Sequence, residues 1–138
     1  MELQDKKNTS KRNKHTGTRL ERYKKSFINA LEGIIYVTRY EHNMIIIICM
    51  MMLVTILGLI LKIDNYEWLF IITISGLIVA CEMINSALEA IVDLITTEIN
   101  PLAKTAKDIA SSATLVLCIA SLIGGLIIFI PKIIEMFF

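Results

Sequence analysis

Three stretches of the chain contain no charged residue, and short polar segments separate them. They cover residues 44–61, 68–81 and 109–130. The first and third are long enough to cross a bilayer as helices, which takes about 20 residues. The second is shorter, but no helix breaker separates it from residues 82–93, so the two together predict one long helix. We predict three membrane-spanning helices, over residues 44–62, 67–96 and 101–130.

A different periodicity precedes the first apolar stretch. Between residues 19 and 40, Leu20, Tyr23 and Phe27 begin a series of apolar positions spaced by three and four, with charged residues on the other faces. This pattern is typical of an amphipathic helix lying on a membrane surface. Residues 1–18 are polar and basic, and we expect a disordered tail near anionic headgroups. The predicted fold class is an all-α membrane protein with one membrane domain over residues 19–138.

Local signals mark the ends of the third membrane helix. Asn100 is expected to cap its start, with Pro101 in the first helical position. Pro131 is expected to end it. Within its first two turns, Lys104 and Asp108 are four residues apart and are expected to share a face as an ion pair. These features make the third helix a separate element from the second.

The charges are unevenly distributed although the net charge is only +1. Of the 14 Lys and Arg residues, ten precede the first apolar stretch. We therefore expect a protein of the plasma (inner) membrane, and the positive-inside rule places its N-terminus in the cytoplasm. The turn at residues 62–67 then faces outward, and residues 96–107 face the cytoplasm. No aromatic or folded partner accompanies the basic tail, so a nucleic-acid partner is not expected.

The second membrane helix carries a stripe of polar residues: Glu82, Asn85, Glu89 and Asp93. At 100° per residue they fall within an arc of roughly 80° on one helix face. An unpaired charge in such an apolar setting costs at least about 2.5 kcal/mol. A bound cation is one way to offset this cost, because clustered carboxylates are typical cation ligands. The alternative is a stripe hydrogen-bonded to neighbouring helices with one Glu protonated.

The predicted topology brings further polar residues to the same membrane face. They are Arg22, Lys25, Glu41, Glu89, Asp93, Lys107 and Asp108, with Glu82 just beneath. Carboxylates for Mg²⁺, a lysine for phosphate oxygens and a buried carboxylate as base are the parts that phosphoryl transfer needs. Neither the GxxxxGK[ST] loop nor a glycine-rich kinase loop is present, so a nucleotide site would differ from both. A simpler interpretation makes Glu41 a solvated helix cap and Lys107 a member of a surface ion pair.

Two other classes of function remain open from these residues. A proton- or ion-coupled transporter could use the acidic stripe as a relay, although the stripe lies at one surface and does not cross the bilayer. A non-catalytic assembly subunit would leave Lys107 and the stripe without a purpose. The three cysteines are dispersed, one in each apolar stretch, and are interpreted as small buried hydrophobic residues.

The stripe also resembles a known signature. Glu82-x-x-Asn85-Ser86-Ala87-Leu88-Glu89-x-x-Val92-Asp93 is similar to that of the prokaryotic diacylglycerol kinase/undecaprenol kinase family. Ala106-Lys107-Asp108 resembles the second motif of the family, and Glu41-x-Asn43-Met44 resembles the site before its first span. The resemblance covers about residues 19–130.

This resemblance implies a homotrimer in the lipid bilayer, with active sites shared between subunits and ATP-dependent phosphorylation of a membrane lipid alcohol. Glu41 and Glu89 would bind Mg²⁺ at the ATP phosphates, and Glu82 would be the general base. The remaining ATP-binding residues would be Arg22, Asn85, Asp93, Lys107 and Asp108. Lys25 and Ser111 would join Glu82 at the acceptor lipid. The basic tail and the Glu-x-Asn-Met stretch favour undecaprenol as acceptor, and diacylglycerol is the alternative.

The chain departs from the family pattern at a few positions. Tyr40 and Ile45 stand where relatives often carry a polar or basic residue, and Ser111-Ser112 replaces a more usual Ala/Gly pair. These changes put nucleotide contacts and lipid choice in doubt, whereas the metal and base positions keep the expected residues.

Overall fold

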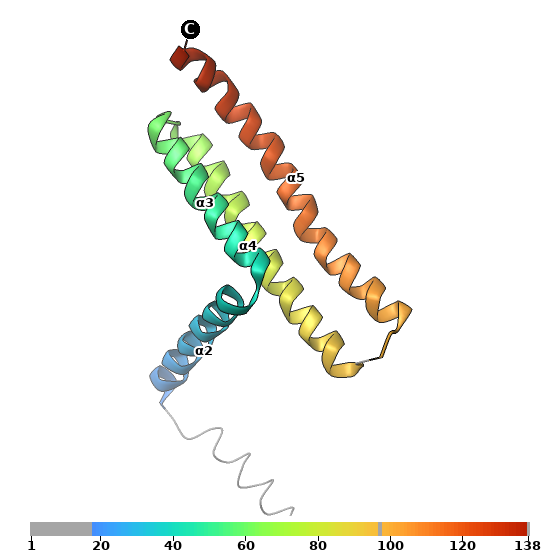
Figure 1. Ribbon diagram of the computed structural model, residues 1–138. Helices are drawn as coiled ribbons and strands as arrows, with labels where there is room; N and C mark the ends of the chain where they lie inside the picture. The colour runs from blue at the N-terminus through green and yellow to red at the C-terminus, as the bar shows by residue number, and fades with distance from the viewer. Residues whose placement is uncertain (1–17, 97, 138) are drawn as a thin grey trace, which may run out of the picture. The chain divides into compact units, whose positions relative to one another are not determined.

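The structure, a computed structural model, describes residues 18–96 and 98–137, which form helices and no strand. The helices are α2 (Arg19–Tyr40), α3 (His42–Ile60), α4 (Asn65–Ile95) and α5 (Pro101–Phe137) (Figure 1). The last three are each long and apolar enough to cross a membrane, which confirms the prediction of an all-α chain with three spanning helices. All but the last residue of the predicted basic tail lies outside the described residues.

The chain divides into two compact units, with the boundary after Ile35 inside α2. In the first unit, Thr18 and Glu21 cap the start of α2. The Glu21 amide donates to Thr18 Oγ1 at 3.3 Å, and the Thr18 amide donates to Glu21 Oε2 at 2.8 Å. Tyr23 and Phe27 are exposed, and no residue of this part of α2 is buried. An amphipathic helix with an open apolar face fits the predicted surface helix.

In the second unit, α4 packs against both α3 and α5. The turn between α3 and α4 is closed by a capping box, because the Asp64 side chain accepts from the Tyr66 and Glu67 amides while Glu67 Oε2 accepts from the Asp64 amide. Gly58 permits the close approach, since a Cβ atom there would lie 2.9 Å from the Ile63 side chain. The start of α4 is therefore anchored against the end of α3.

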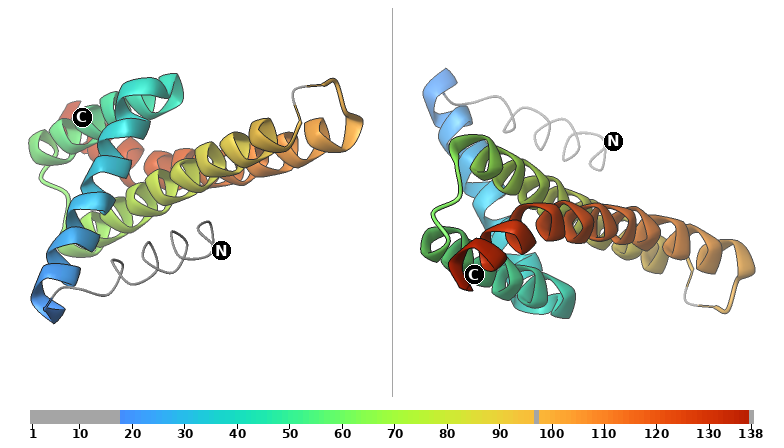
Figure 2. Two further views of the ribbon diagram at one scale, coloured as in Figure 1. Left: turned by 90° about the horizontal axis from the view of Figure 1, so that it is seen from below. Right: turned by 90° about the horizontal axis from the view of Figure 1, so that it is seen from above.

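Two ion pairs define how α4 and α5 align. Lys107 Nζ lies 2.5 Å from Asp93 Oδ1 near the connecting loop, and Lys132 Nζ lies 2.9 Å from Glu67 Oε2 at the other end. The two pairs are 25 residues apart along α5, from 107 to 132, and 26 residues apart along α4, from 67 to 93. The two helices therefore run antiparallel and side by side along their length (Figure 2).

The ends of α5 show one confirmed prediction and one that is wrong. Asn100 caps the helix as expected, because its Oδ1 accepts from the Leu102 amide at 2.9 Å. Pro131, however, lies inside α5, which continues to Phe137. Proline removes one backbone hydrogen bond, but the ion pair from the next residue, Lys132 to Glu67, holds the last turns of α5 against α4.

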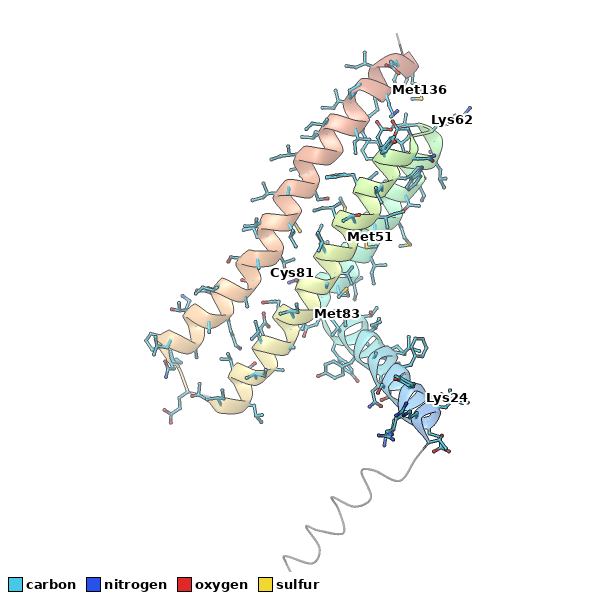
Figure 3. The ribbon with its side chains drawn as sticks, turned by 180° about the vertical axis from the view of Figure 1, so that it is seen from behind. Lys24, Met51, Lys62, Cys81, Met83 and Met136 are labelled. Carbon is cyan, nitrogen blue, oxygen red and sulfur yellow. The ribbon has the colours of Figure 1, made fainter. Side chains whose placement is uncertain are left out.

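Few apolar side chains of the described residues are buried. Met44, Ile71 and Ile78 are among those that are, whereas most of the large apolar side chains on α3, α4 and α5 are exposed. In Figure 3 these side chains project all along the three helices, from the turn at Lys62 to the region of Met83. Such a surface is far larger than the apolar patches of soluble monomers, so lipid or further protein covers it.

Candidate active site

The polar stripe of α4 passes from buried to exposed along the helix. Glu82 is 2% exposed and Asn85 is 4% exposed, Glu89 is half-buried, and Asp93 is exposed. Because the ion pair of Asp93 with Lys107 lies at the loop end of α4, burial increases with distance from the loop. The stripe thus leads from an accessible mouth to an enclosed carboxylate.

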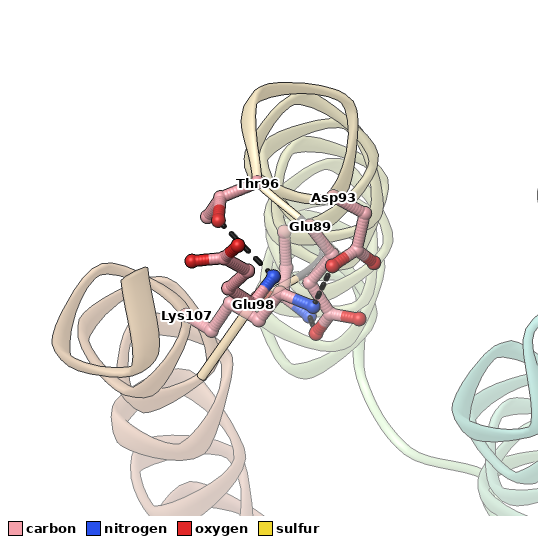
Figure 4. Close-up of polar contacts among 6 residues, drawn as sticks. Glu89, Asp93, Thr96, Glu98 and Lys107 are labelled. Atoms are coloured by element: carbon pink, nitrogen blue, oxygen red, sulfur yellow. Dashed lines mark hydrogen bonds and ion pairs between the residues drawn. The ribbon is translucent and has the colours of Figure 1, made fainter. Parts of the chain in front are cut away.

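At the mouth, side chains of α4 and α5 meet (Figure 4). Asn85 Nδ2 donates to Glu89 Oε1 at 3.0 Å, one turn along α4. Lys107 Nζ donates to Asp93 Oδ1. Lys104 forms no ion pair with Asp108 in the part of the chain that the structure describes, contrary to the sequence prediction. Lys107 pairs instead because it lies on the face of α5 that meets α4.

Glu82 lies deeper between the helices. Its backbone carbonyl accepts from Ser86 Oγ at 3.0 Å, whereas its carboxylate has no hydrogen bond or ion pair with any described residue. Cys118 of α5 lies within electrostatic range of this carboxylate. A buried carboxylate without a partner is available to accept a proton or a hydrogen bond from a bound molecule.

Glu41 stands at the break between α2 and α3. It occupies the N-cap position of α3 and has the extended backbone usual there, with φ −97° and ψ 115°, but its side chain makes no capping hydrogen bond. Gly58 faces Trp68 near the turn between α3 and α4. Glu41 lies seventeen residues before Gly58, and Asn85 lies seventeen residues after Trp68. Glu41 is therefore level with Asn85 along the helix axes.

The other predicted site residues lie on exposed surfaces. Arg22 and Lys25 belong to the first unit, where both are exposed. Asp108 and Ser111 are exposed on α5, and Ser111 Oγ donates to the Asp108 backbone carbonyl at 3.1 Å. Within one chain, the structure brings Glu82, Asn85, Glu89, Asp93 and Lys107 together along the α4–α5 seam.

Sequence reasoning missed Thr114. It is 8% exposed on α5, and its Oγ1 has no hydrogen-bond partner among the described residues. The available signal was its position seven residues after Lys107, which is two turns along the same helix face.

An apolar groove of about 480 Å³ runs along the membrane-spanning part of the second unit. It lies between α3, α4 and α5, and its lining includes Met51, Ile74, Leu122 and Gly125. On α4 the lining reaches Ile78, one turn before Glu82. The groove therefore extends from near the level of the buried carboxylate toward the turn between α3 and α4.

The donor set suits a magnesium ion that is shared with phosphate groups. Among the described residues no three His, Cys, Asp or Glu side chains converge as a complete metal site. Magnesium, however, is commonly held by one or two carboxylates together with substrate phosphates. The Glu89 carboxylate, oriented by Asn85 and half-buried near Lys107, fits such a site.

Comparison with known proteins gives consistent matches. The family model for prokaryotic diacylglycerol kinase matches residues 28–129. The undecaprenol kinase of Bacillus subtilis (strain 168) is 40% identical over 113 residues, which cover 82% of this chain and 92% of that protein. The diacylglycerol kinase of Helicobacter pylori (strain J99) is 51% identical over 53 residues, 38% of this chain and 41% of that protein.

Proposed function

The chain belongs to the prokaryotic diacylglycerol kinase family, and on that basis we propose that it transfers the terminal phosphoryl group of ATP to the hydroxyl group of undecaprenol. The chain is a membrane lipid kinase that uses ATP as phosphate donor. Undecaprenol is favoured because the undecaprenol kinase relative matches most of both chains, whereas the diacylglycerol kinase relatives match 38% of this one. Diacylglycerol is the alternative acceptor.

The observation that carries the proposal is the enclosed, unpartnered carboxylate of Glu82 beside a polar mouth. As general base, Glu82 takes the proton of the acceptor hydroxyl. The hydroxyl oxygen then bonds to the γ-phosphorus, the bond from this phosphorus to the β–γ bridging oxygen breaks, and ADP leaves. Burial between α4 and α5 excludes water, which would otherwise compete as acceptor.

The mouth residues hold the nucleotide. Lys107, presented on the α4-facing side of α5, binds phosphate oxygens, and Asp93 fixes its side chain in the absence of nucleotide. Glu89 and Glu41 hold Mg²⁺, which neutralises phosphate charge when bound. Asn85 orients Glu89 through the 3.0 Å hydrogen bond. Asp108 and Arg22 complete the nucleotide contacts, while Lys25 and Ser111 contact the acceptor lipid.

The apolar groove holds the hydrocarbon chain of the acceptor. Its lining reaches Ile78, one turn from Glu82, which lets a lipid place its hydroxyl at the carboxylate while the chain extends along α3, α4 and α5. The polar mouth faces the cytoplasm, where ATP is available, because most basic residues precede α3. The exposed apolar faces of the three helices support assembly as a homotrimer in the plasma membrane.

The test is transfer of labelled γ-phosphate from Mg·ATP in detergent micelles, with undecaprenol and diacylglycerol offered separately. We expect wild-type chain to label undecaprenol faster. Glu82→Gln should lower the rate about 10²–10⁴-fold, the contribution of a general base. Glu135→Gln is the matched control, because Glu135 is exposed at the far end of α5 and forms no ion pair among the described residues. Absence of label on both lipids, in folded protein, would contradict the kinase proposal, and faster labelling of diacylglycerol would reverse the substrate order.

A further inference from the structure

Only the nitrogen of the Asn85 side-chain amide forms a hydrogen bond among the described residues. Nδ2 donates to Glu89 Oε1 at 3.0 Å, but Oδ1 is buried without a hydrogen-bond partner among the described residues. Across the helix interface, Thr114 Oγ1 is in the same condition. Buried polar atoms nearly always have a partner in protein or ordered water, so these two oxygens require an explanation.

The alignment of the helices places the two oxygens at the same level. Thr114 lies seven residues after Lys107, and Ser86 lies seven residues before Asp93. Because Lys107 and Asp93 are paired and α4 and α5 are antiparallel, Thr114 faces the Asn85–Ser86 level of α4. Both residues are more than nine-tenths buried, so they lie in the interface between the two helices.

Asn85 Oδ1 and the Thr114 hydroxyl can both be satisfied by one water molecule that lies between them. The Ser86 hydroxyl already donates to the Glu82 carbonyl, so it offers no hydrogen to Asn85 Oδ1. An amide oxygen accepts, and a threonine hydroxyl both donates and accepts. One water molecule between them can donate to Asn85 Oδ1 and bond to the Thr114 hydroxyl, as buried waters commonly do.

We propose that Thr114 is a positioning residue of phosphoryl transfer: its hydroxyl and Asn85 Oδ1 share one bound water, which holds the Asn85 amide with Nδ2 toward Glu89. Without this link the buried Oδ1 has no partner, and the amide rotates out of the position in which Nδ2 donates to Glu89 in order to find one. Thr114 thereby acts on the orientation of Glu89. The inference rests on the proposed role of Glu89 as a magnesium ligand.

The experiment compares Thr114→Val, which keeps the shape and removes the hydroxyl, with Thr114→Ser, which keeps the hydroxyl. Full-length protein in detergent is assayed for kcat, for lipid KM, and for the Mg²⁺ concentration that gives half-maximal rate. A second readout does not depend on turnover: the Mg²⁺ concentration that half-saturates the rise in Tm produced with a non-hydrolysable ATP analogue. Thr55→Val is the matched control, since the exposed Thr55 hydroxyl bonds to Met51 of its own helix.

We expect Thr114→Val to raise the half-saturating Mg²⁺ concentration roughly tenfold in both readouts, the lower end of the loss on removing a group that orients a metal ligand. Lipid KM should stay within about twofold, and Thr114→Ser should restore the Mg²⁺ requirement. Unchanged Mg²⁺ dependence in Thr114→Val, equal loss in both Thr114 variants, or a change confined to lipid KM would each overturn the proposal. If wild-type protein transfers no phosphate, the proposed function fails, while the melting readout still tests Thr114.

Discussion

At the scale of single residues, the side chains of the α4 stripe differ mainly in how far water reaches them. Glu82 is enclosed, while Asp93 at the other end is exposed. An exposed ion pair contributes little to the free energy of unfolding because water and salt screen it. The usual contribution is about 0.5 kcal/mol. The Lys107–Asp93 pair is of this kind, since the Asp93 side chain is 66% exposed. In the proposed site, the role of this pair is to orient Lys107 for phosphate binding.

The weak Lys107–Asp93 ion pair and the proposed phosphate contact of Lys107 together give a prediction. Lys107→Met should lower kcat/KM for ATP by roughly tenfold or more, because one charge-assisted phosphate contact is lost. The free energy of unfolding should change by less than about 1 kcal/mol. Steady-state kinetics and thermal melting in detergent measure the two effects. Lys104→Met is the control, since Lys104 is one turn away on α5, exposed and without an ion pair among the described residues. Equal kinetic effects of both changes would contradict a specific role for Lys107.

At the scale of elements, the α4–α5 pair forms the frame of the site, and its ends are fixed separately. One end is held by Lys132–Glu67 together with the Asp64 capping box, and the other by Lys107–Asp93. Between them, close packing depends on glycine at position 124, because a Cβ atom there would overlap the ring of Phe70. Small residues of this kind let membrane helices approach each other closely.

Gly124→Ala is therefore expected to destabilise the helix pair by about 1–3 kcal/mol, the usual cost of overpacking. Gly125→Ala is the matched control, because its Cβ would meet only the Phe129 ring at 4.0 Å. There the higher helix propensity of alanine should leave stability unchanged or raise it by up to about 1 kcal/mol. Thermal unfolding of both variants in the same detergent measures the difference. If Gly124→Ala were as stable as Gly125→Ala, α4 and α5 would tolerate a wider spacing.

At the scale of the whole molecule, one chain leaves most of its apolar helix surface uncovered. Among the described residues of that chain, no group of three His, Cys, Asp or Glu side chains that could hold a metal ion includes Glu41 and Glu89, although both are proposed to bind the same ion. Both observations fit an assembly in which Glu41 of one subunit meets Glu89 of another. The proposed homotrimer supplies such interfaces.

Mixing two inactive variants tests this assembly. Glu41→Gln and Glu89→Gln should each have little activity alone, because each lacks one proposed metal ligand. If the ligands come from different subunits, a refolded equimolar mixture should regain roughly a quarter of wild-type activity, since random assembly pairs two intact residues at that frequency. Light scattering in detergent should give the mass of three chains. No recovery in a mixture that forms trimers would mean that each site is built within one chain.

Much of the fold was determined by the sequence alone. Charge-free stretches of bilayer length predicted three spanning helices, because the hydrocarbon core excludes charge and forces backbone groups to pair within each helix. The spacing of Glu82, Asn85, Glu89 and Asp93 predicted a single polar stripe, because helix geometry is local. The cap at Asn100 was also predicted correctly, since it depends on neighbouring residues only.

Only the tertiary structure decided which residues meet across the helices. The choice of Lys107 over Lys104 for an ion pair depends on how α5 is rotated against α4, and no local rule gives that rotation. α5 continues through Pro131, and the next residue, Lys132, pairs with Glu67 of α4, which lies far away in the sequence. The burial of Thr114, on which its proposed role rests, is of the same kind, because burial and the loss of water contacts arise when two helices pack together.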